Sequence, residues 1–174
     1  TRCGERTAVA EETPNERHKR ELVAEVAARG ARVVEDQPAG SPDRVEEFVA
    51  HYLAHVHADD LADRQPEELL GVILQHYRLA RHRGVNSDDV LVFTPDADRD
   101  GWDLNGSTAL QIVTDDRPFL VDSVTMEAIR QGWSIRDVYH PQFVVVRDAD
   151  GVMTDVVHRA DRGSGGVSES WVHM

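Results

Sequence analysis

The spacing of apolar residues changes near residue 86. Before that point they recur every three or four positions, which is the spacing of one face of a helix. After it, short apolar runs alternate with polar turns, a pattern typical of strands. One kind of element cannot satisfy both spacings. The sequence therefore predicts an α+β fold in which N-terminal helices precede a sheet.

Three helices are expected in the first half. The first runs from Asn15, as its N-cap, to Gly30. The second begins at Pro42, with the preceding serine, Ser41, as its cap. The third begins at Pro66 and ends in a basic turn, which includes Arg83. The second helix has its apolar stripe at Val45, Phe48, Val49, Tyr52, Leu53 and Val56.

The second half predicts a ferredoxin-like βαββ sheet with one face covered by a helix. Strand-like runs lie at 90–94, 108–114, 143–146 and 152–157, and residues 134–139 alternate in polarity. The helix of this unit begins at Leu120 and ends at Gly132, with Leu120, Val121, Val124, Ala128 and Ile129 facing inward. Residues 171–174 resemble the opening of one more strand, truncated by the end of the sequence. We expect an N-terminal extension over 1–40, a helical segment over 41–86 and an α+β domain over 87–174.

Composition narrows the classes of function. Asp and Glu number 32 against 19 Lys and Arg, which gives a net charge of -13. This balance argues against nucleic acid as a partner, because phosphate binding needs a basic face. A single cysteine, Cys3, excludes a disulfide framework within the chain. With no long apolar run and no signal-peptide pattern, we expect a cytoplasmic protein without membrane contact.

Motifs for cofactors and nucleophiles are missing from the sequence. It contains no glycine-rich dinucleotide fingerprint, no phosphate-binding P-loop and no serine-hydrolase elbow. The glycine-rich stretch 163–166 is followed by a strand-like run, so it lacks the helix that would help to bind a phosphate. No catalytic, cofactor-binding or metal-binding residue is assigned to this chain.

One histidine-rich segment leaves a metal site open as an alternative. His55, His57 and Asp59 lie in the sequence HVHADD, which resembles the H-x-H-x-D-H signature of metallo-β-lactamases without its last histidine. Such ligands can hold zinc in a loop that follows a strand. Here an amphipathic helix precedes them, which favours a histidine-rich helix end. A metal-dependent hydrolase that uses these residues is the second alternative function.

The sequence TDDRPFLVDS, residues 114–123, joins an apolar strand to an amphipathic helix. Acidic residues at such a corner commonly cap the helix or hold the turn. The free amides of a helix start also attract carboxylates, so a ligand could bind here. The candidate residues for an effector site or an interface are Asp115, Asp116, Arg117, Pro118, Phe119 and Asp122.

Several longer motifs resemble a known family. They are IVTDDRPFLVDSVTMEAIRQG at 112–132, the pair His140-Pro141, VVVRDADG at 144–151 and ESWVHM at 169–174. Together with the helical segment upstream, they are similar to the N-terminal region of the large bacterial NAD-specific glutamate dehydrogenases. The resemblance extends from Pro42 to Met174.

This resemblance implies a division of labour within a long polypeptide. The family oxidises L-glutamate with NAD and water to 2-oxoglutarate, ammonium and NADH, and its catalytic lysine and its NAD-binding domain lie far downstream. The only lysine here is Lys19. We therefore expect a regulatory or assembly domain that is inactive alone, with NAD as a cofactor of the full-length enzyme only. Its expected partners are the downstream domains and, in the full-length enzyme, further copies of the chain.

The corner also resembles the D-R-P-G-L-L-x-D-V signature of ACT domains, small βαββαβ modules that often sense amino acids. Phe119 stands where that signature has glycine. The glycine normally lets the backbone approach a ligand. The departure favours packing at this corner over effector binding, and an amino-acid-sensing ACT module remains the first alternative.

Overall fold

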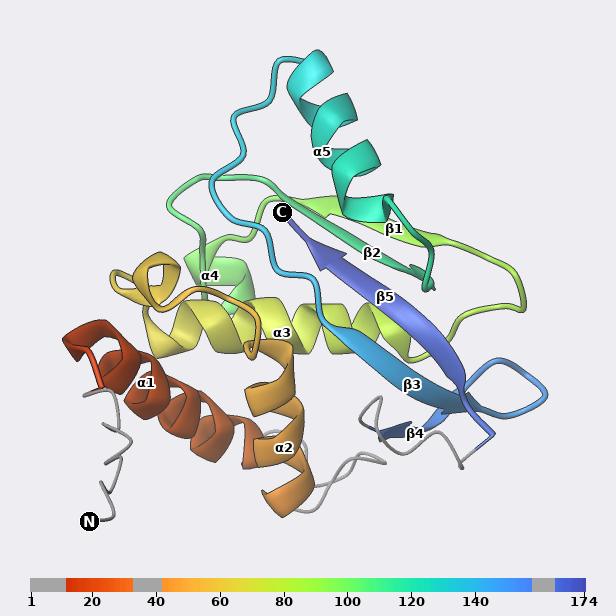
Figure 1. The fold of residues 1–174 in the computed structure, drawn as a ribbon, viewed down its shortest axis with the longest axis horizontal. Coiled ribbons are helices and arrows are strands. Elements are labelled where there is room, and N and C mark those ends of the chain that lie inside the picture. The colour runs from red at the N-terminus through yellow and green to blue at the C-terminus, as the bar shows by residue number, and fades with distance from the viewer. Residues whose placement is uncertain (1–11, 33–41, 158–164) are drawn as a thin grey trace, which may run out of the picture.

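A computed structural model describes residues 12–32, 42–157 and 165–174 of the chain (Figure 1). Cys3, Ser41 and residues 163–164 of the glycine-rich stretch 163–166 lie outside the described residues. The helices are α1 (Pro14–Ala31), α2 (Pro42–Tyr52), the 3₁₀ helix η1 (Ala58–Leu61), α3 (Pro66–Ala80), α4 (Ala97–Asp100) and α5 (Leu120–Arg130). The strands are β1 (Asp89–Phe93), β2 (Ala109–Asp115), β3 (Gln142–Arg147), β4 (Met153–Val157) and β5 (Val167–His173). The predicted α+β class is confirmed, and the domain limits at 40 and 86 stay predictions.

The N-cap of helix α1 lies two residues before the predicted cap, Asn15. Thr13 is the N-cap, and its hydroxyl accepts a hydrogen bond from the Glu16 amide while the Glu16 carboxylate accepts one from the Thr13 amide. This reciprocal pair satisfies two free amides, so it outcompetes a cap at Asn15. The Asn15 amide group instead donates to Asp59, which ties α1 to η1.

The apolar stripe predicted for the second helix is real, but the helix is shorter than the stripe. Helix α2 ends at Tyr52, whereas Leu53 and Val56 reach the same core from the turn that follows. Helix α3 has the predicted start at Pro66 and packs along β1 and β2. Gly71 of α3 lies beneath the indole ring of Trp102, where a β-carbon would overlap the ring. Trp102 therefore fixes the β1–β2 connection against α3.

All neighbouring strands of the sheet are antiparallel, in the order β1-β2-β5-β3-β4. The short run at 171–174 belongs to β5, which lies between β2 and β3 in the middle of the sheet. It was predicted only as the opening of a strand. Residues 134–139 form no strand, apart from a bridge between Tyr139 and His173.

The two faces of the sheet carry different helices. Paired residues of antiparallel strands share a face, so Trp171 and Val113 both point to the main core with α1, α2 and α3. The opposite face carries α5, whose apolar side chains pack on a smaller cluster. That cluster contains Leu110, Ile112 and Val172, with Leu120, Val121, Val124 and Met174 against it.

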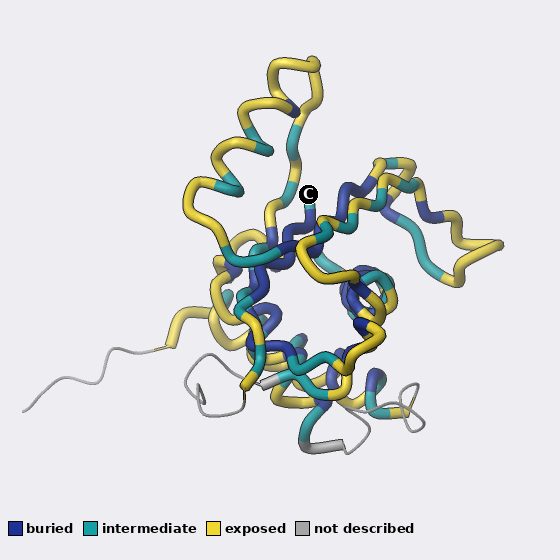
Figure 2. Tube along the Cα trace, turned by 90° about the vertical axis from the view of Figure 1, so that its right-hand side faces the viewer, coloured by how far each residue is buried: buried dark blue, intermediate teal, exposed yellow. Residues whose placement is uncertain are grey.

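Helix α5 stands away from the body of the protein, and most of its length is exposed (Figures 1 and 2). Ala128 is its one buried residue. Ile129 was predicted to face inward, which is wrong, because it is largely exposed. The helix rests on the sheet mainly through its first two turns. No helix in the described part of the chain is long and apolar enough to cross a membrane.

A buried histidine links α2, α3 and β2. The His76 ring donates from Nε2 to the carbonyl of Ile112 at 3.1 Å and accepts at Nδ1 from the Tyr52 hydroxyl at 2.7 Å. A carbonyl can only accept, so the bond to Ile112 fixes this tautomer. Burial lowers the pKa of His76 to about 3, and burial also lowers the pKa of His173 to about 3.

Because the pKa values of these two histidines are lowered by burial, we expect the folded protein to lose stability in acid. In the unfolded chain they bind protons below a pKa of about 6.5, but in the folded protein only near pH 3. Their contribution is therefore complete above pH ~6.5 and falls by about 1.4 kcal/mol per histidine for each pH unit below it. Urea unfolding between pH 7.5 and 4.5 measures this slope. His76→Gln should flatten it and the exposed control His57→Ala should not; equal slopes in all three proteins would contradict the prediction.

Candidate functional site

The corner between β2 and α5 turns on a residue in the left-handed conformation. Phe119 is the N-cap of α5, with φ 62° and ψ 15°, and its side chain makes no capping hydrogen bond. A non-glycine residue costs about 1–2 kcal/mol in this conformation. The chain thus keeps a glycine-like backbone at the position where the ACT signature has glycine. Phe119 was predicted to pack, but within the described structure its ring is largely exposed.

Asp116 ties the corner to the neighbouring strands. Its carboxylate accepts hydrogen bonds at 2.8 Å from the Gln142 side chain and from the Ser170 hydroxyl. Its amide donates to the carbonyl of Ser168 at 2.9 Å. The acids of this corner were predicted to cap the helix or to hold the turn; Asp116 does not cap α5, and its partners on β3 and β5 hold the turn instead.

Arg117 forms an exposed ion pair with Asp88 at 3.1 Å. The Thr114 hydroxyl also donates to Asp88, and this bond together with Arg117 lowers the pKa of that carboxyl. Because both charged groups are about half exposed, the pair adds little to stability. It does hold Arg117 on the β1 side of the corner.

Five of the six predicted residues border one cavity. Its volume is about 440 Å³. The predicted residues around it are Asp116, Arg117, Pro118, Phe119 and Asp122. His140 also lines it; burial lowers the pKa of this histidine, and its Nε2 has no hydrogen-bond partner among the described residues. The cavity thus combines carboxylates, a guanidinium and an imidazole.

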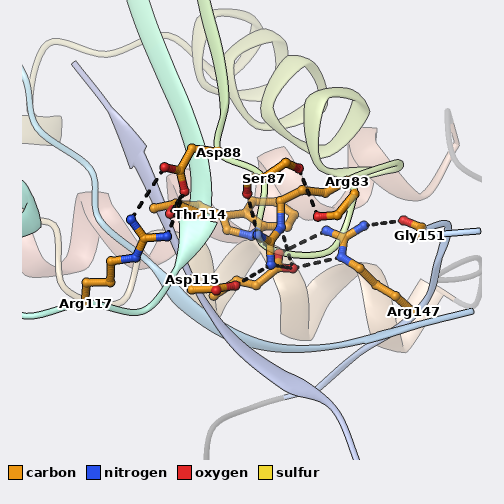
Figure 3. Close-up of polar contacts among 11 residues, drawn as sticks. Arg83, Ser87, Asp88, Thr114, Asp115, Arg117, Arg147 and Gly151 are labelled. Atoms are coloured by element: carbon orange, nitrogen blue, oxygen red, sulfur yellow. Dashed lines mark hydrogen bonds and ion pairs between the residues drawn. The ribbon is translucent and has the colours of Figure 1, made fainter. Parts of the chain in front are cut away.

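The sixth residue, Asp115, belongs to a different group of charges, shown in Figure 3. It pairs with Arg83 at 2.7 Å. Arg83 also donates to Glu169 from two nitrogens, at 2.9 and 3.1 Å, and Arg147 donates to the same carboxylate at 2.8 and 3.0 Å. The indole N–H of Trp171 adds a fifth donor atom at 3.2 Å. Glu169 is completely buried, so we call Arg83, Asp115, Arg147 and Glu169 the buried ion cluster.

The sequence analysis missed the buried ion cluster. It assigned Arg83 to the basic end of a helix, whereas the helix ends at Ala80 and Arg83 turns into the protein. A signal was present in ESWVHM. Glu169 lies two residues before Trp171 in a strand, so both side chains must point to the same face. A glutamate beside a buried tryptophan requires a cationic partner.

Removing the central charge of this cluster should destabilise the protein. Glu169→Gln leaves two arginines facing each other near a single aspartate, and breaking a buried ion pair in this way costs about 3–5 kcal/mol. The matched control is Glu127→Gln, which removes an exposed carboxylate paired with Arg130 and should change stability by less than about 0.5 kcal/mol. Urea denaturation at pH 7 compares them. A loss for Glu169→Gln as small as the control's would contradict the assigned role.

The starts of α3 and α5 carry carboxylates, namely Glu67 and Glu68 on α3 and Asp122 on α5, and so lack the features of an NAD pyrophosphate site. Like charge next to phosphate is unfavourable. No step of dehydrogenase chemistry is therefore assigned to this chain.

The proposed zinc ligands do not form a site in the described structure. His57 and Asp59 approach to 3.5 Å, and Asp59 also accepts a hydrogen bond from Asn15. No group of three histidine, cysteine or carboxylate side chains in the described ranges has the geometry to hold a metal ion. The geometry gives the metal-dependent hydrolase alternative no support.

Comparison with known proteins points to one family. The sequence profile of the glutamate dehydrogenase ACT1 domain matches residues 48–174. An NAD-specific glutamate dehydrogenase of Pseudomonas aeruginosa is 30% identical over 127 residues, which is 73% of this chain but 8% of that protein. Proteins of the same name from Halomonas elongata and Mycobacterium tuberculosis are 32% and 33% identical over 60% and 57% of the chain, each covered to 6%.

The chain therefore spans less than a tenth of the length of these curated relatives. No solved structure gives a significant match. The profile covers the second half of α2, the whole of α3, the whole sheet and the β2–α5 corner, and this agrees with the resemblance found from the motifs. The chain belongs to the ACT1-domain family of the glutamate dehydrogenases.

Proposed function

We propose that this chain is a non-catalytic assembly domain in the N-terminal region of a large NAD-specific glutamate dehydrogenase. The observation that carries the proposal is the family match over 48–174. In the complete enzyme, L-glutamate, NAD and water would give 2-oxoglutarate, ammonium and NADH on other domains. Its partners would be those downstream domains and further copies of the polypeptide, in the cytoplasm.

The internal contacts of the corner favour assembly over chemistry. Asp115, Asp116 and Arg117 each have a partner within the chain, so these charges hold strands and loops in place. A general acid or base instead needs access to a substrate proton. The corner exposes Phe119 together with Arg117, Pro118 and Asp122, and the exposed apolar side chains of Met126 and Ile129 follow on α5. Exposed apolar surface of this kind is typical of contacts with other proteins.

The assignment predicts where glutamate oxidation occurs. The purified 174-residue chain should form no NADH from glutamate and NAD above a buffer blank, while the complete polypeptide should form it under the same conditions. Absorbance at the NADH maximum measures both. NADH formation by the chain alone would overturn the non-catalytic assignment, and a complete polypeptide without this activity would overturn the enzyme assignment.

The corner cavity favours a second candidate, the sensing of a free amino acid. A ligand with one ammonium and one carboxylate would match Asp116 and Asp122 on one side and Arg117 with the α5 amides on the other. The cavity of about 440 Å³ has room for such a molecule. This module would pass the state of the amino-acid pool to the rest of the enzyme, which would require two global states that differ in ligand affinity.

Thermal shift measurements separate the two candidates. A ligand that binds only the folded protein raises its stability by RT ln(1 + [L]/Kd), about 2.7 kcal/mol at a hundredfold excess over Kd. Under the assembly proposal, no amino acid at millimolar concentration should raise the melting temperature. A rise that is lost in Asp122→Asn but kept in the remote control Asp63→Asn would favour sensing instead.

A further inference from the structure

The outer face of α5 carries an exposed apolar stripe. It consists of Phe119, Met126, Ile129 and Trp133, with exposed fractions of 75%, 72%, 60% and 48%. Met126 and Ile129 lie within α5, whereas Phe119, its left-handed N-cap, and Trp133, which follows Gly132, flank its two ends. The inner side of α5 is separate, because Leu120, Val121 and Val124 already pack on the sheet. The stripe is therefore surplus to the packing of the domain itself.

Trp133, the last residue of the stripe, is fixed by the C-terminal cap of α5. Gly132 has φ 85°, and the Trp133 amide donates to the carbonyl of Ala128 at 3.0 Å. This is the hydrogen bond of a helix C-cap, which folds the chain back over the last turn. Trp133 thus stays at the C-terminal end of α5, where it lines a cavity together with Ala128 and Met174.

The order of residues along α5 is self-complementary about Met126. Seven residues before Met126 lies Phe119, and seven after it lies Trp133. Four residues before it lies Asp122, and four after it lies Arg130. Two such helices placed antiparallel, with the two Met126 side chains together, would bring each Asp122 to an Arg130, and the end of one helix that bears Phe119 toward the end of the other that bears Trp133.

We propose that α5 packs antiparallel against α5 of a second copy of this chain, about a two-fold axis at Met126. This inference rests on the proposed assembly function and names its contact. A two-fold interface uses the same patch on both partners, so it requires this kind of symmetric pattern. Met126 lies at its centre, and the two Asp122–Arg130 pairs flank it, where they set orientation.

The position of α5 makes this contact accessible. The helix stands clear of the three N-terminal helices, on the other face of the sheet (Figure 1). It is also the most exposed of the longer elements when seen from the side (Figure 2). Arg130 pairs with Glu127 on its own helix at 2.7 Å, and both side chains are more than half exposed. An exposed pair of this kind is weak enough to be exchanged for, or shared with, a partner's carboxylate.

Cysteine cross-linking tests the axis. In a Cys3→Ser background, Met126→Cys places two thiols at the two-fold axis, so mild oxidation should give a disulfide-linked dimer in most of the protein. Val85→Cys is the control, because Val85 is even more exposed but lies outside the stripe. Dimer formation no greater for Met126→Cys than for the control would overturn the proposal.

Charge reversal tests the direction of the helices and the identity of the partner. Sedimentation velocity of the 174-residue chain, up to a few hundred micromolar, should show a monomer–dimer equilibrium. Asp122→Arg alone and Arg130→Asp alone should each weaken it roughly tenfold, since each change places like charges together twice. The double variant Asp122→Arg/Arg130→Asp should restore it, because the pairs re-form with their signs exchanged.

The sedimentation results decide whether a second copy of this chain occupies the stripe. Restored dimers in the double variant support antiparallel pairing of two copies. A chain that stays monomeric over the whole range, or a double variant as weak as the single ones, overturns it and leaves a different protein segment as the occupant of the stripe. Melting temperatures of the variants check folding, which these exposed positions should not affect. Failure of the proposed function itself would appear as NADH formation by the chain, which these experiments do not measure.

Discussion

A carboxylate with no exposed surface, Glu169, determines how the parts of this protein meet. It lies in the middle strand of the sheet and accepts hydrogen bonds from Arg83, just after α3, and from Arg147, at the end of β3. Such a charge is tolerated in the interior only when every partner is in place. Since Arg83 also pairs with Asp115, the end of β2 is fixed by the same group. The helical half and the sheet are thereby locked in one relative position.

The β2–α5 corner inherits its geometry from this arrangement. Asp115 faces the buried cluster, so the next residue, Asp116, must face the opposite side of the sheet, where it binds Gln142 and Ser170. Two adjacent aspartates thus fasten the corner from both faces. Beyond them, α5 rests on the sheet mainly through a few apolar side chains. Helix α5 is therefore more sparsely anchored than the strands that precede and follow it.

Helices and strands were predicted correctly where interactions between residues close in sequence determine them. The start of α3 at Pro66, with acids in the first turn, follows from capping and the helix dipole. The central place of β5 could not be predicted, because strand order depends on pairing between distant segments. The buried ion cluster was missed for the same reason. Its members come from four separate elements, and a charged residue near a helix end is usually exposed.

The candidate site, too, was predicted from the sequence only in part. The corner and its residues were identified from a motif, yet the partners of Asp115 and Asp116 lie up to 54 residues away. Ile129 was assigned to the inner face from helical spacing alone, which says where the apolar side chains lie around a helix and not how far the sheet beneath it extends. The exposed stripe on α5 came into view only when the sheet was found to cover one side of it.

At Phe119 the backbone conformation of the corner does not depend on the presence of glycine. Because the conformation is kept without glycine, the shape of the loop does not depend on the side chain it bears. A single replacement at this position could therefore exchange an aromatic contact for an open approach to the α5 amides while the strands stay in register. In a corner of this kind, one substitution is enough to change a surface that contacts another protein into one that binds a small molecule.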